Sequence, residues 1–318
     1  MLLFDLDRGH GVAAALARRL GLEIAPHEER AFADGEFKLR PLVDPADADA
    51  YIVHALHGEA GCSPHDKLFR LLDLTATLRA HRARRVTAVV PYLAYARKDR
   101  RTQAFDPLGQ RHVAQLFEAA GLGQMIALEV HNVAAFENAF RCPTQHLPAH
   151  PAFLEVARAQ PAERPLVVAS PDAGGVKRVQ LWREQLEVVL ARPVGMAMVD
   201  KRRVGGVVSG GELVAGDVAG ASVLLLDDLI ASGDTLLRAA RALRAAGAAA
   251  VSACAAHGLF VGAAPRLLMD DALDAVCICD SVPPLRLAQG EPLHRKLRVL
   301  SCVPLLADAL RRSGSGRA

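Results

Sequence analysis

Short apolar runs alternate along the chain with segments that have the periodicity of amphipathic helices. Six aliphatic runs have the length and composition of buried strands: residues 86–90, 125–130, 166–169, 222–226, 250–256 and 275–279. Their uniformly apolar character is typical of parallel strands that are covered on both faces. Ala- and Leu-rich helical patterns occupy residues 11–20, 67–81, 109–120, 174–185 and 235–246. This alternation predicts an α/β fold with parallel sheets and right-handed crossovers.

The length of 318 residues favours two domains, at about 100–200 residues for each domain. Prolines punctuate residues 143–165, which marks a candidate boundary. We therefore place an N-terminal domain at residues 1–147 and a C-terminal domain at residues 148–300, and we expect residues 301–312 to pack back on the first. A glycine-rich stretch at residues 204–216 follows a basic triplet and is compatible with either a hairpin turn or a mobile lid.

The composition narrows the classes of function that the chain can have. The apolar fraction of 51% and the charged fraction of 23% argue against a disordered chain. The formal net charge of +3 is too small to indicate a nucleic-acid or membrane partner, and the aromatic fraction of 4% argues against a stacking platform for single strands. We see no signal-peptide pattern and no apolar run that could span a bilayer, so we expect a cytoplasmic protein.

The cysteines and histidines give weaker signals. The six cysteines are scattered and include no CxxC pair, so we interpret them as structural thiols rather than zinc ligands. Several histidines gather between His54 and His65 in a stretch that matches no motif. We expect a surface loop there, with an added metal site as the alternative.

The most specific local pattern covers residues 222–236, where a buried strand leads through Asp227 and Asp228 into a short loop and the start of a helix. The loop and helix start are formed by Ala231, Ser232, Gly233, Asp234 and Thr235. Ligands of open α/β sheets bind beyond the carboxyl ends of strands, and a helix N-terminus favours an anion. The two acids would suit vicinal sugar hydroxyls or a hydrated Mg²⁺. This loop resembles the ribose-5-phosphate loop of type I phosphoribosyltransferases.

Further motifs follow one another along the chain. They are Phe-Ala-Asp-Gly-Glu at 32–36, Pro-Tyr-Leu-Ala-Tyr-Ala-Arg-Lys-Asp-Arg-Arg at 91–101, His131 after a strand, Ser-Pro-Asp-Ala-Gly-Gly at 170–175, Asp-Lys-Arg-Arg at 200–203 and Gly-Asp-Val-Ala-Gly at 216–220. Together they resemble the ribose-phosphate pyrophosphokinase family over nearly the whole chain. The resemblance implies two type I phosphoribosyltransferase-like domains, each a largely parallel sheet flanked by helices. It also implies transfer of the β,γ-diphosphoryl group of MgATP to the C1 hydroxyl of ribose 5-phosphate, with release of AMP.

The resemblance also implies a role for each matching residue. Phe32, Asp34 and Glu36 match an adenine-binding loop that a neighbouring subunit contributes, which implies a homodimer or a higher homo-oligomer with a shared ATP site. The other ATP-binding positions are Arg97, Lys98, Asp99, Arg100 and His131. His131 and Asp172 match positions linked to the Mg²⁺ cofactor. Lys201 and Arg203 match the basic pair of a catalytic loop, which would neutralise charge on the transferred group.

Three positions depart from the usual pattern of this family. Lys98 stands where most relatives carry Gln, Ala231 where many carry Asp, and Asp234 where many carry Gly. A carboxylate at Asp234 would repel a phosphate dianion unless its side chain turned outward. Two alternatives therefore remain open beside the active pyrophosphokinase. One is a catalytically weak or inactive regulatory paralogue, and the other is a phosphoribosyltransferase that consumes the family's product.

Overall fold

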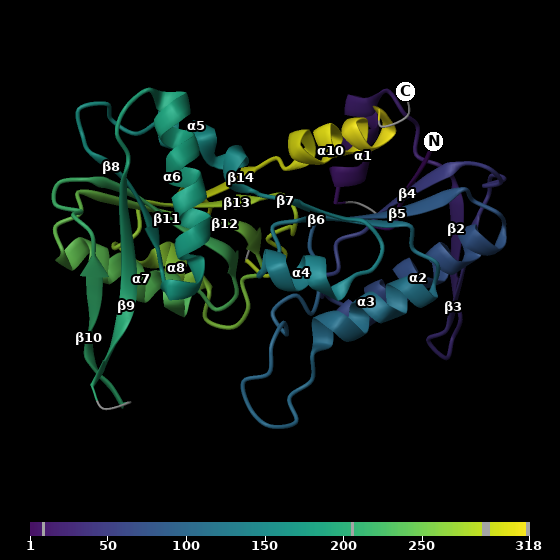
Figure 1. Ribbon diagram of the computed structural model, residues 1–318, viewed down its shortest axis with the longest axis horizontal. Coiled ribbons are helices and arrows are strands. Elements are labelled where there is room, and N and C mark those ends of the chain that lie inside the picture. Colours follow the sequence, from purple (N-terminus) through teal and green to yellow (C-terminus); the bar gives the residue numbers. More distant parts are fainter. Residues whose placement is uncertain (8–9, 205–206, 288–292, 316–318) are drawn as a thin grey trace. The chain divides into compact units, whose positions relative to one another are not determined.

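The chain forms two compact units, shown in Figure 1. This computed structural model describes residues 1–7, 10–204, 207–287 and 293–315, without the side chains of residues 201–211, 293–294 and 314–315. The first unit comprises Met1–Pro148 together with Cys302–Ala318, and the second comprises Ala149–Ser301. The chain thus leaves the first unit once and returns to it at its C-terminal end.

The first unit is built on a five-stranded sheet in the order β1-β4-β5-β6-β7, in which all neighbours are parallel. The strands are β1 (Leu2–Asp5), β4 (Asp49–Val53), β5 (Arg85–Val90), β6 (Gln124–Leu128) and β7 (Thr144–Leu147). Helices α2 (Pro64–Ala80) and α3 (Gly109–Ala119) cover one face, and α1 (Val12–Leu20) and α10 (Val303–Ser315) cover the other (Figure 1). The short helix α4 (Val133–Ala139) follows β6.

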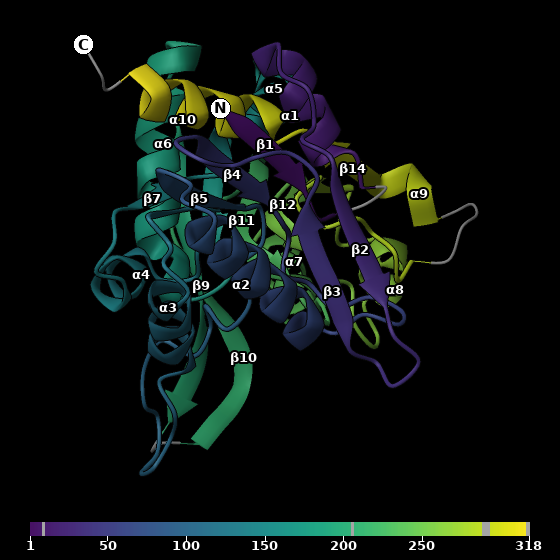
Figure 2. The same ribbon diagram turned by 90° about the vertical axis from the view of Figure 1, so that its right-hand side faces the viewer.

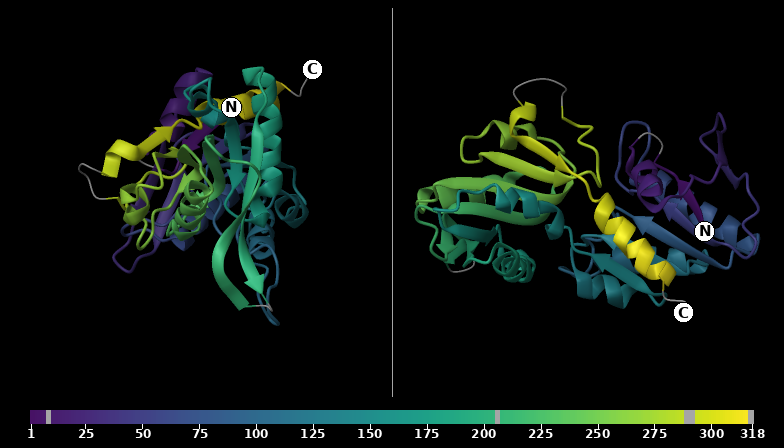
Figure 3. Two further views of the ribbon diagram at one scale, coloured as in Figure 1. Left: turned by 90° about the vertical axis from the view of Figure 1, so that its left-hand side faces the viewer. Right: turned by 90° about the horizontal axis from the view of Figure 1, so that it is seen from above.

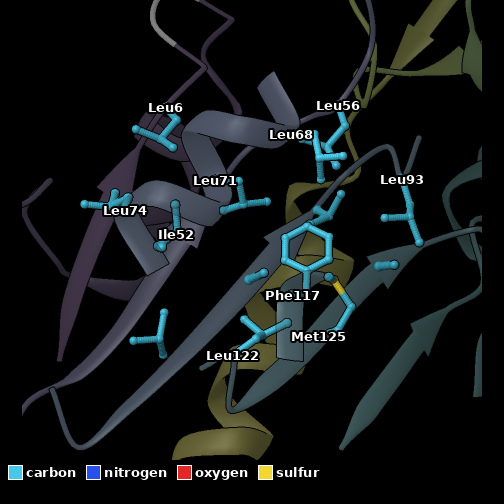
Figure 4. Packing of buried hydrophobic residues seen from close by; sticks show 14 of the residues in the cluster. Leu6, Ile52, Leu56, Leu68, Leu71, Leu74, Leu93, Phe117, Leu122 and Met125 are labelled. Carbon is cyan, nitrogen blue, oxygen red and sulfur yellow. The ribbon is translucent and has the colours of Figure 1, made fainter. Parts of the chain in front are cut away.

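The core of the first unit forms where α2 packs on the sheet. Leu68, Leu71, Leu74 and Leu78 recur at helical spacing and are buried, so α2 presents a continuous apolar stripe to the strands (Figure 4). Ser63 begins the helix with a capping box, in which Ser63 and Asp66 satisfy each other's backbone amides. The start of α2, next to the carboxyl end of β4, is therefore well anchored.

A two-stranded antiparallel hairpin, β2 (His27–Ala31) with β3 (Phe37–Pro41), projects from the first unit (Figure 2). It packs on α2 along its middle and next to its turn, where Arg70 Nε donates to Glu29 at 2.6 Å and the rings of Phe37 and Phe69 pack edge to face at 5.6 Å. The turn of the hairpin carries residues 32–36. These contacts hold the turn away from the sheet.

The second unit has a seven-stranded sheet in the order β10-β9-β8-β11-β12-β13-β14, parallel except for the β9–β10 pair. The strands are β8 (Leu166–Ser170), β9 (Gly195–Val204), β10 (Val207–Ala215), β11 (Ser222–Ile230), β12 (Ala250–Gly258), β13 (Ala275–Cys279) and β14 (Leu297–Leu300). The helices are η1 (His150–Phe153), α5 (Leu154–Arg158), η2 (Ala173–Gly175), α6 (Val176–Leu190), α7 (Asp234–Ala245), α8 (Pro265–Met269) and α9 (Leu293–Lys296). The β9–β10 hairpin projects beyond the rest of the sheet (Figure 3).

Both faces of this sheet are covered. Val223 and Leu225 of β11 share a buried cluster with Leu236 and Leu243 of α7. The alternate residues of the strand point to the opposite face, where α6 packs on β8 and buries Trp182. Uniformly apolar strands therefore follow from coverage on both sides, as the sequence pattern indicates.

The predicted α/β fold is confirmed, while several element boundaries differ. Strand β11 continues through both acids to Ile230, because its ladder with β12 continues as far as the Ile230–Gly258 pair. Strand β6 ends at Leu128, where Glu129 takes a positive φ of 36°. Residues 207–215 of the glycine-rich stretch form β10, and residues 205–206 lie outside the described residues. No helix in the described ranges is long and apolar enough to cross a membrane.

Candidate active site

A cavity of about 720 Å³ lies in the first unit, beyond the carboxyl ends of β5 and β6. Its lining includes Arg97, Lys98, Asp99, Arg100 and His131, which the sequence predicts to bind ATP. The structure thus brings together all the predicted ATP-binding residues outside the β2–β3 turn. Forked guanidinium donors and an ammonium at one cavity suit the oxygens of a polyphosphate.

The loop that carries these cations is ordered by its own hydrogen bonds. Asp106 Oδ2 accepts from the Thr102 hydroxyl at 2.8 Å and from the backbone amides of Thr102 and Gln103 at 3.0 Å. The Thr102 hydroxyl and the two amides stabilise the carboxylate and lower the pKa of Asp106. Near the start of the loop, Tyr95 adopts a positive φ of 64° and its hydroxyl lies 2.5 Å from His65 Nδ1. Sequence reasoning missed both arrangements, since neither has a motif.

Asp99 is tied to the start of α4 through Asn132. Asn132 Nδ2 donates to Asp99 Oδ2 at 2.8 Å, while Asn132 Oδ1 accepts from the Ala135 amide as the helix cap. The exposed ring of His131 precedes Asn132 and lines the same cavity. Asn132 was not among the predicted site residues, although an Asn just before a helical pattern is a recognisable capping signal.

The β2–β3 turn presents an aromatic ring to solvent. Phe32 is 41% exposed, its amide donates to the Glu36 carbonyl at 2.8 Å, and the Arg30 guanidinium carbon lies 5.3 Å from the ring centroid. Asp34 Oδ1 accepts from the Glu36 amide at 3.1 Å. These three predicted residues are not among the lining residues of the cavity. Their role at the ATP site of a neighbouring subunit stays a prediction.

In the second unit, residues 231–235 connect β11 to the first turn of α7, and we call this segment the cup. Gly233 takes a φ of 82° before the first turn of α7, a conformation that favours glycine, and Leu237 N donates to its carbonyl at 2.9 Å. Ser232 Oγ donates to Asp234 Oδ2 at 2.8 Å. Ala231 and Thr235 complete the loop and are half-buried. The Ser232 hydroxyl, predicted as a phosphate donor, is therefore engaged by the unusual carboxylate of Asp234.

The acid pair lies near the carboxyl end of β11, with Asp228 buried and Asp227 half-buried. The Asp228 amide donates to Asp227 Oδ1 at 2.8 Å. Burial, together with the charge of Asp228, raises the pKa of Asp227 well above its usual range, and Arg178 offsets this only in part. A cation or hydroxyl donors bound here would relieve this repulsion between the carboxylates.

Asp172 follows β8, the neighbour of β11, in a tightly packed turn. Its Oδ1 accepts from the amides of Gly174 at 2.8 Å and Gly175 at 3.2 Å, and Ser170 Oγ donates to its carbonyl. A Cβ at Gly175 would lie 2.5 Å from Ser170 Oγ, so only glycine fits. His131 belongs to the first unit and Asp172 to the second. Their shared metal site stays a prediction.

The predicted catalytic cations lie on β9. In the ladder with β10, Lys201 is opposite Glu212 and Arg203 is opposite Val208. Their side chains lie outside the described residues, so their catalytic role stays a prediction.

The prediction of a surface loop between His54 and His65 is wrong for the first part of this stretch. His54 and His57 are each 1% exposed, because the chain turns inward beyond β4 and packs them against α2 and the end of β1. His65 lines the cavity described above. An isolated bridge between Glu59 and Cys62 closes the intervening turn.

The fold and the two loop sites define a class of protein: a two-domain α/β protein built from phosphoribosyltransferase-like units. The model of the N-terminal domain of ribose phosphate pyrophosphokinase matches residues 1–121, and that of the phosphoribosyl synthetase-associated domain matches residues 210–317. A ribose-phosphate pyrophosphokinase of Hyphomonas neptunium is 32% identical over 98% of this chain and 96% of its own length. The chain belongs to the ribose-phosphate pyrophosphokinase family.

Two further comparisons agree. A ribose-phosphate pyrophosphokinase of Haemophilus influenzae is 33% identical over 95% of this chain and 92% of its own length. The crystal structure of phosphoribosylpyrophosphate synthetase from Mycobacterium smegmatis superposes with a TM-score of 0.84 at 27% identity, covering 98% of each chain. The resemblance stated from the motifs alone is confirmed.

Proposed function

We propose that this chain is an active ribose-phosphate diphosphokinase. It transfers the β,γ-diphosphoryl group of MgATP to the C1 hydroxyl of ribose 5-phosphate and yields 5-phosphoribosyl 1-diphosphate and AMP. The convergence of Arg97, Arg100 and His131 on one cavity carries this proposal, because a phosphoribosyltransferase would not require a second polyphosphate site.

On the nucleotide side, the residues of the first unit bind and orient ATP. Arg97, Lys98 and Arg100 hold the phosphates, with Asp99 kept in place by Asn132. Phe32 of a neighbouring subunit stacks on the adenine, while Asp34 and Glu36 shape the turn. The working assembly is then at least a homodimer.

On the sugar side, the cup at the start of α7 holds the 5-phosphate. Backbone amides and hydroxyls at residues 231–235 donate to the phosphate oxygens. Asp227 and Asp228 accept from the ribose hydroxyls and so orient the C1 hydroxyl for attack. Lys201 and Arg203 approach the transferred group and stabilise the charge that it develops.

The donor set fits Mg²⁺, which prefers oxygen ligands. Asp172, Asp227 and Asp228 place carboxylates near the carboxyl ends of the adjacent strands β8 and β11, where burial and the charge of Asp228 raise the pKa of Asp227. When bound, Mg²⁺ neutralises charge on the phosphates. The imidazole of His131 is a less typical Mg²⁺ ligand, so His131 acts through a bound water or by orienting phosphate.

One observation favours a second candidate, a catalytically weak paralogue. Asp234 places a carboxylate in the phosphate cup and engages Ser232. This contact weakens binding of ribose 5-phosphate if the side chain stays in place during binding.

The test is incubation of the pure protein with MgATP and ribose 5-phosphate, followed by chromatography of the nucleotides. The proposal requires AMP formation that depends on ribose 5-phosphate. ATP binding without AMP would support the paralogue. Release of pyrophosphate from phosphoribosyl pyrophosphate in the presence of a base would instead identify a phosphoribosyltransferase.

A further inference from the structure

A second cluster of ionisable side chains lies at the carboxyl ends of β1 and β4 in the first unit. It comprises Asp7, His10, His54, His57, Glu59 and Lys67. None of these residues belongs to the lining of the cation-lined cavity, and the proposed reaction uses none of them. Asp7, His54, His57 and Lys67 are all less than 5% exposed. Burial of so many polar groups costs free energy unless they pair with one another or with a ligand.

The geometry of three of these side chains matches a metal-ligand set. His10 Nε2 lies 3.0 Å and His57 Nε2 lies 3.7 Å from Glu59 Oε2, and the ligand atoms of the three residues all lie within 4.8 Å of one another. Ligands at 2.0–2.1 Å from a tetrahedral Zn²⁺ are separated by about 3.3 Å. Small adjustments would therefore place all three on one cation, and two histidines with one glutamate are a known zinc set.

We propose that His10, His57 and Glu59 bind a first-row transition-metal cation of the Zn²⁺ class, and that the Lys67 ammonium occupies this place in the metal-free protein. Lys67 Nζ lies 2.9 Å from Glu59 Oε1 and 3.4 Å from His57 Nε2. Asp7 Oδ1 lies 3.7 Å from the same ammonium and gives Lys67 an alternative partner when a metal binds. None of these three residues belongs to the proposed Mg²⁺ site. Their two imidazoles also suit Zn²⁺ far better than Mg²⁺.

The ligands are held by rigid local structure. Glu59 and Cys62 exchange backbone hydrogen bonds across a tight turn at Gly61, whose φ is 72°. Lys67 lies in the first turn of α2, behind the capping box of Ser63. Such support is typical of a site whose ligands are placed before the ion arrives.

Charge and access are compatible with the proposal. His57 is 1% exposed, and imidazole binds metals in its neutral form. The side chains of His10 and Glu59 are 16% and 22% exposed, which leaves the cluster open to solvent on that side.

The experiment is titration of the chelator-treated, full-length protein with Zn²⁺ alone, followed by calorimetry and by metal analysis after gel filtration. We expect one bound Zn²⁺ whose affinity falls at least about 100-fold in His57→Ala and in Glu59→Gln. His81→Ala, at the exposed end of α2, and Cys62→Ser are the matched controls, and both should keep the wild-type affinity. If His57→Ala fails to fold, the more exposed His10→Ala carries the same expectation.

Lys67→Met tests the second half of the proposal. Removing the resident ammonium should tighten Zn²⁺ binding by at least about tenfold. The proposal is overturned if wild-type and Glu59→Gln bind Zn²⁺ equally, if Cys62→Ser alone loses the ion, or if Lys67→Met binds no more tightly. None of these measurements requires substrate, so failure here leaves the proposed diphosphokinase activity untouched.

Discussion

The two units differ in the charge that they present at the sites for which we propose phosphate ligands. The cavity of the first unit is lined by side-chain cations, including Arg97, Lys98 and Arg100. The cup of the second unit is surrounded by acids, with Asp227 and Asp228 at the end of β11 and Asp234 at the start of α7. Both sites lie at the carboxyl ends of parallel strands, where an α/β sheet places its ligands.

The difference follows from the ligands that we propose. A triphosphate carries several negative charges, which long flexible cations can neutralise while the nucleotide enters and leaves. A sugar monophosphate also presents hydroxyls, which carboxylates can bind, while backbone amides and a helix N-terminus hold its single phosphate. Carboxylates such as Asp227 and Asp228 can therefore serve the sugar hydroxyls at the cup.

The largest expected effect is on kcat. It concerns the cations that we propose to stabilise the transferred diphosphoryl group in the transition state. Lys201→Ala should lower kcat by roughly 10²–10³ with a much smaller change in the KM of ATP, because its contact strengthens in the transition state. Steady-state assay of AMP formation measures both constants. Arg158→Ala, an exposed cation of the same unit, should leave both unchanged. A large rise in the KM of ATP with an unchanged kcat would contradict this role. It would show that Lys201 contributes to binding of ATP in the ground state, as we propose for the cations of the cavity.

Arg97→Ala tests whether the cavity works through side-chain charge. We expect the KM of ATP to rise about 10–100-fold, since a charged hydrogen-bonding partner of the phosphates is lost, while the KM of ribose 5-phosphate stays the same. Arg97→Lys should recover only part of the affinity, because an ammonium lacks the fork. Arg18→Ala on the exposed face of α1 serves as the control. Equal increases in the KM of ATP and of ribose 5-phosphate would contradict the proposal that each unit binds a different substrate.

Asp234→Gly tests the cup. Removal of the carboxylate and release of the Ser232 hydroxyl should lower the KM of ribose 5-phosphate by about 3–10-fold. Ser232→Ala should weaken binding more strongly in the Asp234→Gly background than in the wild type, which a double-mutant cycle would measure as a coupling. Weaker binding by Asp234→Gly would show that the carboxylate contributes to the site.

The smallest expected effect is on stability. Asp227→Asn keeps an acceptor for the Asp228 amide but removes a buried charge, so it should stabilise the second unit by about 1 kcal/mol, or about 2–4 °C in Tm. The raised pKa of Asp227 makes the wild-type penalty appear as the pH rises through that pKa. The difference in Tm between variant and wild type should therefore be larger at neutral than at acidic pH. A constant difference across that range would contradict the assignment.

Much of the fold could be predicted from sequence because its central strands are apolar on both faces. Strands β5 and β13 match their predicted runs closely, whereas the hairpin β2–β3 is polar, and charged residues and glycines interrupt the apolar residues of β9–β10. The end of β11 was missed for the same reason, since Asp227 and Asp228 interrupt the apolar run while the ladder continues.

The residues of the candidate site were likewise predicted only in part. Motif positions such as Arg97 and His131 were predicted from the resemblance to ribose-phosphate pyrophosphokinases, and the structure places both at one cavity. The Asn132–Asp99 contact joins loops that are distant in sequence, and the burial of His57 depends on α2 folding over it. Neither leaves a local pattern that a single sequence can show.

Amide hydrogen exchange with each substrate added separately tests the central division most directly. MgATP alone should protect residues 97–107 of the first unit, and ribose 5-phosphate alone should protect residues 231–235 of the second, since the phosphate is held there by backbone amides. Protection of the same segment by both substrates, or of each segment by the other substrate, would contradict the account.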